Sequence, residues 1–72
     1  MKVTVDQTEK ILRSGQPFKQ FAFSMMITRL RTKYAKNPTR ESLKECTDEI
    51  NSFIEKFGGI IKDEFLTIQS IK

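Results

Sequence analysis

The sequence contains no histidine and only one cysteine, Cys46. Without histidine the chain lacks the commonest general base and the commonest neutral metal ligand. A single cysteine cannot form a disulfide within the chain, and without histidine it does not suggest a zinc site. Cys46 falls on an apolar helix face, which predicts a buried, unreactive thiol. We therefore expect no metal, no cofactor and no enzymatic activity.

Long hydrophobic runs are also missing. No stretch approaches the roughly 18 apolar residues that a membrane-spanning helix needs, and the first ten residues contain no apolar segment typical of a signal peptide. We expect a cytoplasmic protein without membrane contact, forming one small domain over residues 1–72. Because so short a chain buries only about 60% of its unfolded surface, self-association or a protein partner would help to stabilise it.

Glycine and proline are few, and they divide the chain at residues 14–17, 37–38 and 58–59. A capping box formed by Thr4 and Gln7 predicts a short helix over about 5–14. Pro17 favours the start of a second helix, about 17–36. A third helix, about 39–57, follows a turn so short that the two should form an antiparallel αα-hairpin.

The C-terminal segment, residues 60–71, fits two descriptions. As a helix it places all four of its isoleucines and Phe65 on one side, with only Leu66 outside that side. As a strand, residues 65–71 could pair with residues 1–5, whose apolar and polar residues alternate, to give an α+β fold. We favour the mainly α fold with a C-terminal helix and retain the α+β fold as the alternative.

The second helix carries more apolar surface than one side of a helix can hold. One stripe starts with Phe18, Phe21 and Met25, while a second stripe continues to the end of the helix and is expected to face the core. The first stripe either packs in the core as well, with the second helix covered on more than one side, or forms a surface for a protein partner. In the third helix, the expected core residues follow a heptad-like spacing. They are Leu43, Cys46, Ile50, Phe53 and Phe57.

Acidic residues are absent from the whole segment 10–40, which contains eight basic residues. Residues 41–72 carry seven acids and four lysines, so the net charge of +4 is concentrated in the first half. Such asymmetry predicts a directed electrostatic surface.

The basic residues between 29 and 40 are candidate contacts for an anion or a nucleic acid, mainly through phosphates. They are Arg29, Arg31, Lys33, Lys36 and Arg40. Three of them share one helix face by spacing, whereas Arg31 points the other way. The same stripe could instead pair with acids of the third helix, in this molecule or in a neighbouring one. Those acids are Glu41, Glu45 and Asp48.

Two functions remain open. The first is a small non-catalytic interaction protein that self-associates or binds a protein through apolar surface on the second and third helices. The second is a nucleic-acid-binding or regulatory protein that uses the basic stripe. Reading DNA with the third helix is disfavoured, because the acids on its exposed face would repel the phosphate backbone.

Overall fold

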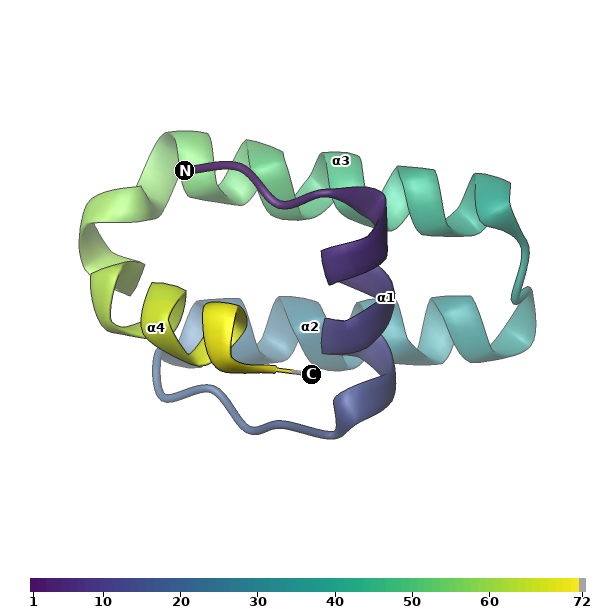
Figure 1. Ribbon diagram of the computed structural model, residues 1–72, viewed down its shortest axis with the longest axis horizontal. Coiled ribbons are helices and arrows are strands. Elements are labelled where there is room, and N and C mark those ends of the chain that lie inside the picture. Colours follow the sequence, from purple (N-terminus) through teal and green to yellow (C-terminus); the bar gives the residue numbers. More distant parts are fainter. Residues whose placement is uncertain (72) are drawn as a thin grey trace.

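The computed structural model describes residues 1–71 and consists of helices and their connections (Figure 1). The elements are α1 (Val5–Ser14), α2 (Phe21–Lys36), α3 (Arg40–Phe57), the 3₁₀ turn η1 (Gly58–Ile61) and α4 (Lys62–Ser70). The mainly α prediction is confirmed. The α+β alternative is wrong, because residues 65–70 are helical and residues 1–4 form an extended arm with no strand beside it among the described residues.

Helix α1 begins and ends as the sequence predicts. The Thr4 side chain accepts a hydrogen bond from the Gln7 amide at 3.1 Å, and the Gln7 side chain accepts one from the Thr4 amide at 2.8 Å. These two bonds satisfy amides that would otherwise be unpaired at a helix start. Gly15 ends the helix with φ of 67°, a left-handed conformation that glycine adopts without a Cβ clash.

Helix α2 begins at Phe21, four residues later than Pro17 would suggest. The Gln20 side chain caps it by accepting the Phe23 amide at 2.7 Å. Just before the helix, the amides of Lys19 and Gln20 donate to one carboxylate oxygen of Glu64, at 2.6 and 3.3 Å. Residues 17–20 therefore form a connection that is held by α4, and Phe18 does not belong to the helix.

Helix α3 starts after Thr39, whose hydroxyl accepts the Ser42 amide at 3.1 Å. At the other end, the glycine pair 58–59 stops the α-helix at Phe57, as predicted, but the chain does not open into a loop. Gly58 keeps right-handed helical angles and the backbone continues through η1 into α4. The reversal from α3 to α4 is thus made by a tight 3₁₀ turn (Figure 1).

The N-terminal arm and α1 are fixed to α3 by polar contacts far apart in sequence. The Val3 amide donates to Asn51 Oδ1 at 2.8 Å, and Asn51 Nδ2 donates back to the Val3 carbonyl at 3.1 Å. Deeper inside, the Thr47 hydroxyl donates to the Thr8 hydroxyl at 2.8 Å. Both threonines are buried, so this bond satisfies polar groups that water cannot reach.

The core lies between the hairpin and the helices α1 and α4, which both cover one side of it (Figure 1). Its buried residues come from helices α1 to α4 and from η1. Three aromatic rings connect the layers: Phe23 packs edge-on against Phe18 at 5.0 Å between centroids and against Phe53 at 5.4 Å. The opposite side of the hairpin, which we call its outer side, is not covered by any helix of residues 1–71 (Figure 1).

Candidate interaction surface

The basic stripe of α2 is paired with α3. Arg29 Nη2 lies 2.8 Å from Glu49 Oε1, and Lys33 Nζ lies 3.6 Å from Glu45 Oε2 and 3.9 Å from Glu49 Oε2. The hydrogen bond to Glu49 raises the pKa of Arg29 above its ordinary value. The predicted pairing with the third helix therefore forms within the chain. Its acids are Glu45, as expected, and Glu49, which the sequence reasoning had not included.

Arg31 points away from this stripe, as its spacing predicts, and serves the fold. Its Nη2 donates to the carbonyls of Ile11 at 3.0 Å and Gln16 at 2.9 Å. These carbonyls lie at and beyond the last turn of α1, where backbone acceptors lack helical partners. Burial lowers the pKa of the guanidinium. Arg31 thus holds the end of α1 against α2 and is not positioned for phosphate.

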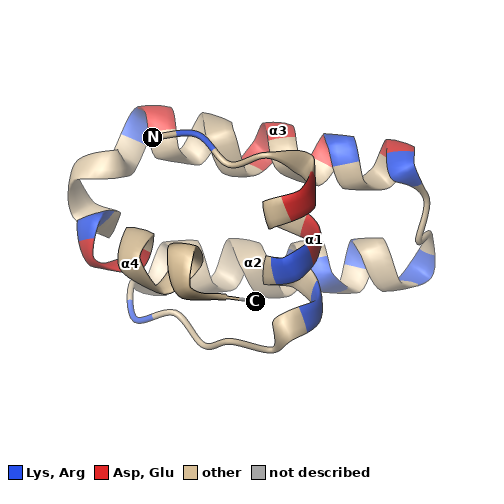
Figure 2. Ribbon diagram, viewed as in Figure 1, with Lys and Arg blue, Asp and Glu red and all other residues tan. Residues whose placement is uncertain are grey.

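Two of the five candidate anion contacts, Lys36 and Arg40, remain at the tip of the hairpin. Both are exposed, and neither forms an ion pair among residues 1–71. Figure 2 shows acidic and basic residues interspersed around this tip rather than a continuous basic area. The five residues therefore do not form one surface.

The predicted partner surface is only partly at the surface. Phe18 is 8% exposed and packs against Phe23, because it lies in the connection before α2 and turns inward. The prediction that Phe18 belongs to a partner surface is wrong, because the helix was expected to start at about residue 17 and in fact begins at Phe21. Phe21 and Met25 are 70% and 58% exposed.

The sequence reasoning missed a third exposed residue of this surface, Phe57. It was expected in the core of α3 but is 48% exposed, whereas Ile54 is buried. Phe57 lies beyond the last core layer, stacked at 5.1 Å on the half-buried Phe53. The exposure of Phe57 could have been predicted from the antiparallel register of α2 against α3.

That register follows from the ion pairs. Moving four residues back along α2, from Lys33 to Arg29, is matched by moving four residues forward along α3, from Glu45 to Glu49. Residues four apart lie on neighbouring positions of one helix face. The next steps place Met25 at the level of Phe53 along the hairpin, and then Phe21 at the level of Phe57, although each step of four residues turns the side chain by about 40° around its helix. We call these four residues the apolar end of the hairpin, and Arg29, Lys33, Glu45 and Glu49 its charged end.

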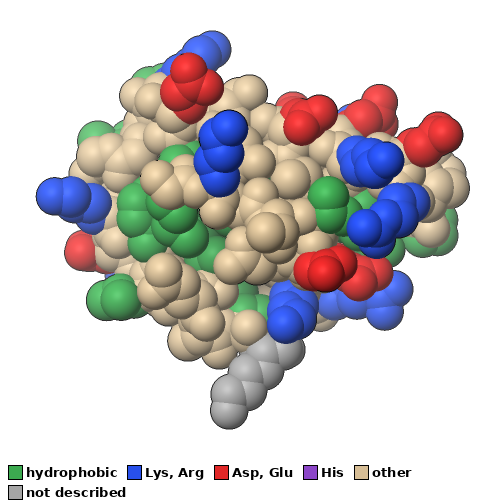
Figure 3. All heavy atoms as spheres, turned by 45° about the horizontal axis from the view of Figure 1, so that its top comes forward, with side chains coloured by type: hydrophobic (Ala, Val, Ile, Leu, Met, Phe, Trp, Pro, Cys, Tyr) green, Lys and Arg blue, Asp and Glu red, His purple; other side chains and the backbone are tan. Residues whose placement is uncertain are grey.

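A space-filling view shows the same separation on another face of the molecule. Hydrophobic side chains gather at the end formed by the N-terminal arm and the turn from α3 to α4, and charges of both signs gather at the hairpin tip (Figure 3). Ile60 and Leu66 contribute exposed apolar surface near that turn, with 61% and 73% of their side chains accessible. Exposed apolar side chains therefore lie at the end of the molecule away from the tip.

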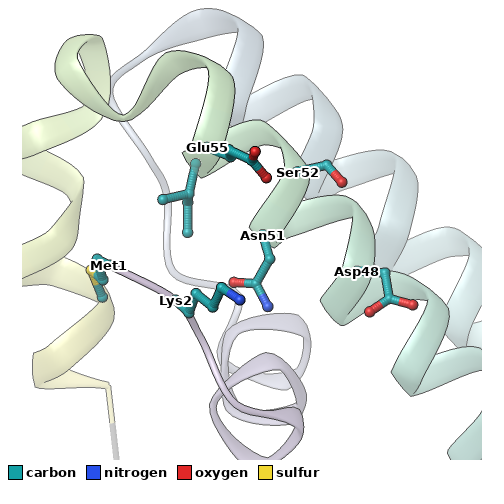
Figure 4. Close-up of a pocket in the computed structure, with 7 residues that line it drawn as sticks. Met1, Lys2, Asp48, Asn51, Ser52 and Glu55 are labelled. Carbon is teal, nitrogen blue, oxygen red and sulfur yellow. The ribbon is translucent and has the colours of Figure 1, made fainter.

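A depression of about 730 Å³ lies between the N-terminal arm and α3. Its lining is mixed in charge: Met1, Lys2, Asp48, Asn51, Ser52, Ile54 and Glu55. Figure 4 shows Lys2 and Asn51 directed toward each other across its lower edge, with Glu55 and Asp48 spread along α3. Asn51 is already engaged by the backbone of Val3, so this depression presents no converging set of free polar groups.

Catalytic chemistry gains no support from the remaining groups. Cys46 is fully buried, and burial raises the pKa of its thiol, which disfavours the thiolate nucleophile. Within residues 1–71, no three histidine, cysteine or acidic side chains lie close enough to hold a metal ion. None of the described helices has the length and apolar character required to cross a membrane.

Comparisons with protein-family models, with curated proteins and with solved structures found no match to this chain.

Proposed function

We propose that this chain is a small, non-catalytic interaction protein that self-associates or binds another protein through the apolar end of the hairpin. The observation that carries the proposal is the exposure of Phe21, Met25 and Phe57 at the same end of the hairpin, where α2 begins and α3 ends. Aromatic residues and methionine are enriched in protein interfaces. Apolar residues clustered on a surface mark interaction sites more often than isolated ones do.

The small size of the chain supports the same proposal. A chain of 72 residues gains only a few kcal/mol from its own core, so covering further apolar surface with a partner adds stability that the fold needs. We place the protein in the cytoplasm, because its one thiol is unpaired and a reducing compartment maintains such a thiol.

Nucleic-acid binding receives less support as the alternative. Three of the five basic residues on which it was based are engaged by Glu49, Glu45 and backbone carbonyls. A phosphate would have to displace the carboxylates, and the carboxylates would then repel it.

Cross-linking in the cells that produce the protein tests the proposal. Lys19 and Lys56 lie beside the apolar end, and both are exposed. We expect intermolecular lysine cross-links from these two positions, identified by mass spectrometry, and we expect Phe21→Ser combined with Met25→Ser to remove them. The matched control replaces Ile60 and Leu66, equally exposed apolar residues outside this surface, with serine. The proposal fails if the cross-links are absent or are unchanged by the first pair of substitutions.

A further inference from the structure

We propose that the partner at this surface is a second copy of the chain, bound outer side to outer side. In this dimer a two-fold axis runs parallel to the helices, so that α2 of each copy lies over α3 of the other. The inference rests on the proposed function, because it assigns the occupant of the same surface. Its basis is the layout of charge and apolar surface on the two helices.

The outer side carries opposite charges on its two helices. Basic residues on α2 recur with helical spacing, and so do acidic residues on α3. The basic column consists of Arg29, Lys33 and Lys36, and the acidic column consists of Glu41, Glu45 and Glu49. Two ion-paired steps, at Arg29 and Lys33, fix the columns side by side. The outermost members, Lys36 and Glu41, are exposed and have no ion pair among residues 1–71.

The sign pattern selects the symmetry axis. An axis parallel to the helices exchanges the two columns, so each basic column faces the acidic column of the other copy. An axis in the same plane but across the helices would place α2 over α2 and reverse the ends of the hairpin. With full overlap, the charged end of each copy would then lie on the apolar end of the other, and an axis through the charged ends would bring like charges together. Complementary charges across an interface fix its register and suppress the wrong one, and a two-fold interface must be complementary to itself.

The same axis also brings the two apolar ends together. Rotation about a line parallel to the helices leaves each end of the hairpin at its own end, so the exposed Phe21 and Met25 of one copy lie at the same level as those of the other. Aromatic and methionine side chains would be covered on both sides, while the charged ends form a four-helix arrangement of antiparallel neighbours. A dimer about the crosswise axis through the apolar ends would leave both charged ends outside the contact.

The dimensions of the molecule favour this broad contact. The hairpin runs along the longest axis, and its two helices lie apart along the second (Figure 1), so it spans the 30 by 21 Å face. A specific dimer buries about 800 Å² on each partner, which requires essentially all of such a face. Another partner would have to present both charge columns in the same register, whereas a second copy presents them by symmetry.

Analytical ultracentrifugation of the purified chain, from about 1 μM to about 1 mM, tests the inference. We expect a reversible dimer. Arg29→Glu with Lys33→Glu makes the outer side acidic, and Glu45→Lys with Glu49→Lys makes it basic. Each double variant alone should dissociate at least tenfold more readily than the wild type, and an equimolar mixture of the two should form a heterodimer.

The matched control is Asp48→Lys with Glu55→Lys, which makes the same charge change on the opposite edge of α3 and should leave dimerisation unchanged. Should a charge-reversal variant not fold, as judged by circular dichroism, Met25→Lys replaces it. Met25 is exposed, so this substitution leaves the core intact and should weaken the dimer at least tenfold.

Any of three results overturns the inference: a wild-type chain that stays monomeric, a dimer unaffected by Met25→Lys, or a mixture of the two charge-reversal variants that forms no heterodimer. The proposed function is decided by a different result, the cellular cross-links. If the purified chain is monomeric but the cellular cross-links lead to a different protein, the second copy is wrong and the interaction surface stands. If the cross-links are absent as well, both fail.

Discussion

The two ends of the hairpin stabilise their outer side chains in different ways. At the charged end, Arg29 and Lys33 reach across to carboxylates of the neighbouring helix, so the chain satisfies these charges by itself. At the apolar end, Phe21 and Met25 cannot be stabilised by an ion pair. Apolar side chains are stabilised by burial away from water. The helices α1 and α4 cover only the inner side of the hairpin, so the apolar side chains on its outer side stay exposed to water unless another protein covers them.

Replacing Phe23, whose ring joins the layers of the core, should have the largest effect on the free energy of unfolding. Phe23 is fully buried between Phe18 and Phe53, so Phe23→Ala should reduce the free energy of unfolding by about 3–5 kcal/mol. Phe21→Ala, two residues earlier and 70% exposed, should cost the monomer less than about 0.5 kcal/mol. Urea denaturation at a concentration where the chain is monomeric measures both. Equal losses would show that the division between core and outer side is wrong.

A buried carboxylate should have the next largest effect. Glu64 is 2% exposed and accepts the amides of Lys19 and Gln20, so Glu64→Ala leaves these donors without an acceptor. We expect a loss of about 1–3 kcal/mol in the free energy of unfolding.

Glu64→Gln separates this role from simple packing, since its amide oxygen can still accept and the loss should be smaller. The neighbouring exposed acid provides the control, Asp63→Asn. Amide chemical shifts of Lys19 and Gln20 should change in the alanine variant. Unchanged shifts would contradict the assigned hydrogen bonds.

The ion pairs of the charged end should contribute least. A double-mutant cycle with Arg29→Gln and Glu49→Gln should give a coupling below about 1 kcal/mol, because Arg29 is largely exposed and Glu49 is partly exposed. The coupling should decrease as salt increases. A coupling above about 2 kcal/mol would mean that the charged end holds the hairpin together, and the contrast between the two ends would then lose its basis.

Much of the fold follows from local sequence signals. The capping box at Thr4, the left-handed Gly15 and the cap at Thr39 each act within a few residues, so they could be recognised without the structure. The start of α2 could not, since it depends on Glu64, which is 44 residues away from Gln20. No local pattern marks Glu64 as a buried acceptor, because its only sequence feature is a place beside another acid.

The surface shows the same limit. Spacing alone predicted that Arg29 and Lys33 share a face and that Arg31 points elsewhere, which the structure confirms. Spacing could not show that Phe18 leaves the helix or that Phe57 extends past the core, because both depend on where neighbouring elements end. The missing information for Phe57 was the antiparallel register of α2 and α3, which a single known ion pair between these helices would have fixed.

The bond between Val3 and Asn51 also bears on how the chain folds during its synthesis. The N-terminal arm leaves the ribosome before α3, and its partner Asn51 is made 48 residues later. The hairpin forms from contacts closer in sequence, which generally form faster. We therefore expect the arm to be among the last segments to find its place, closing over a hairpin that already exists.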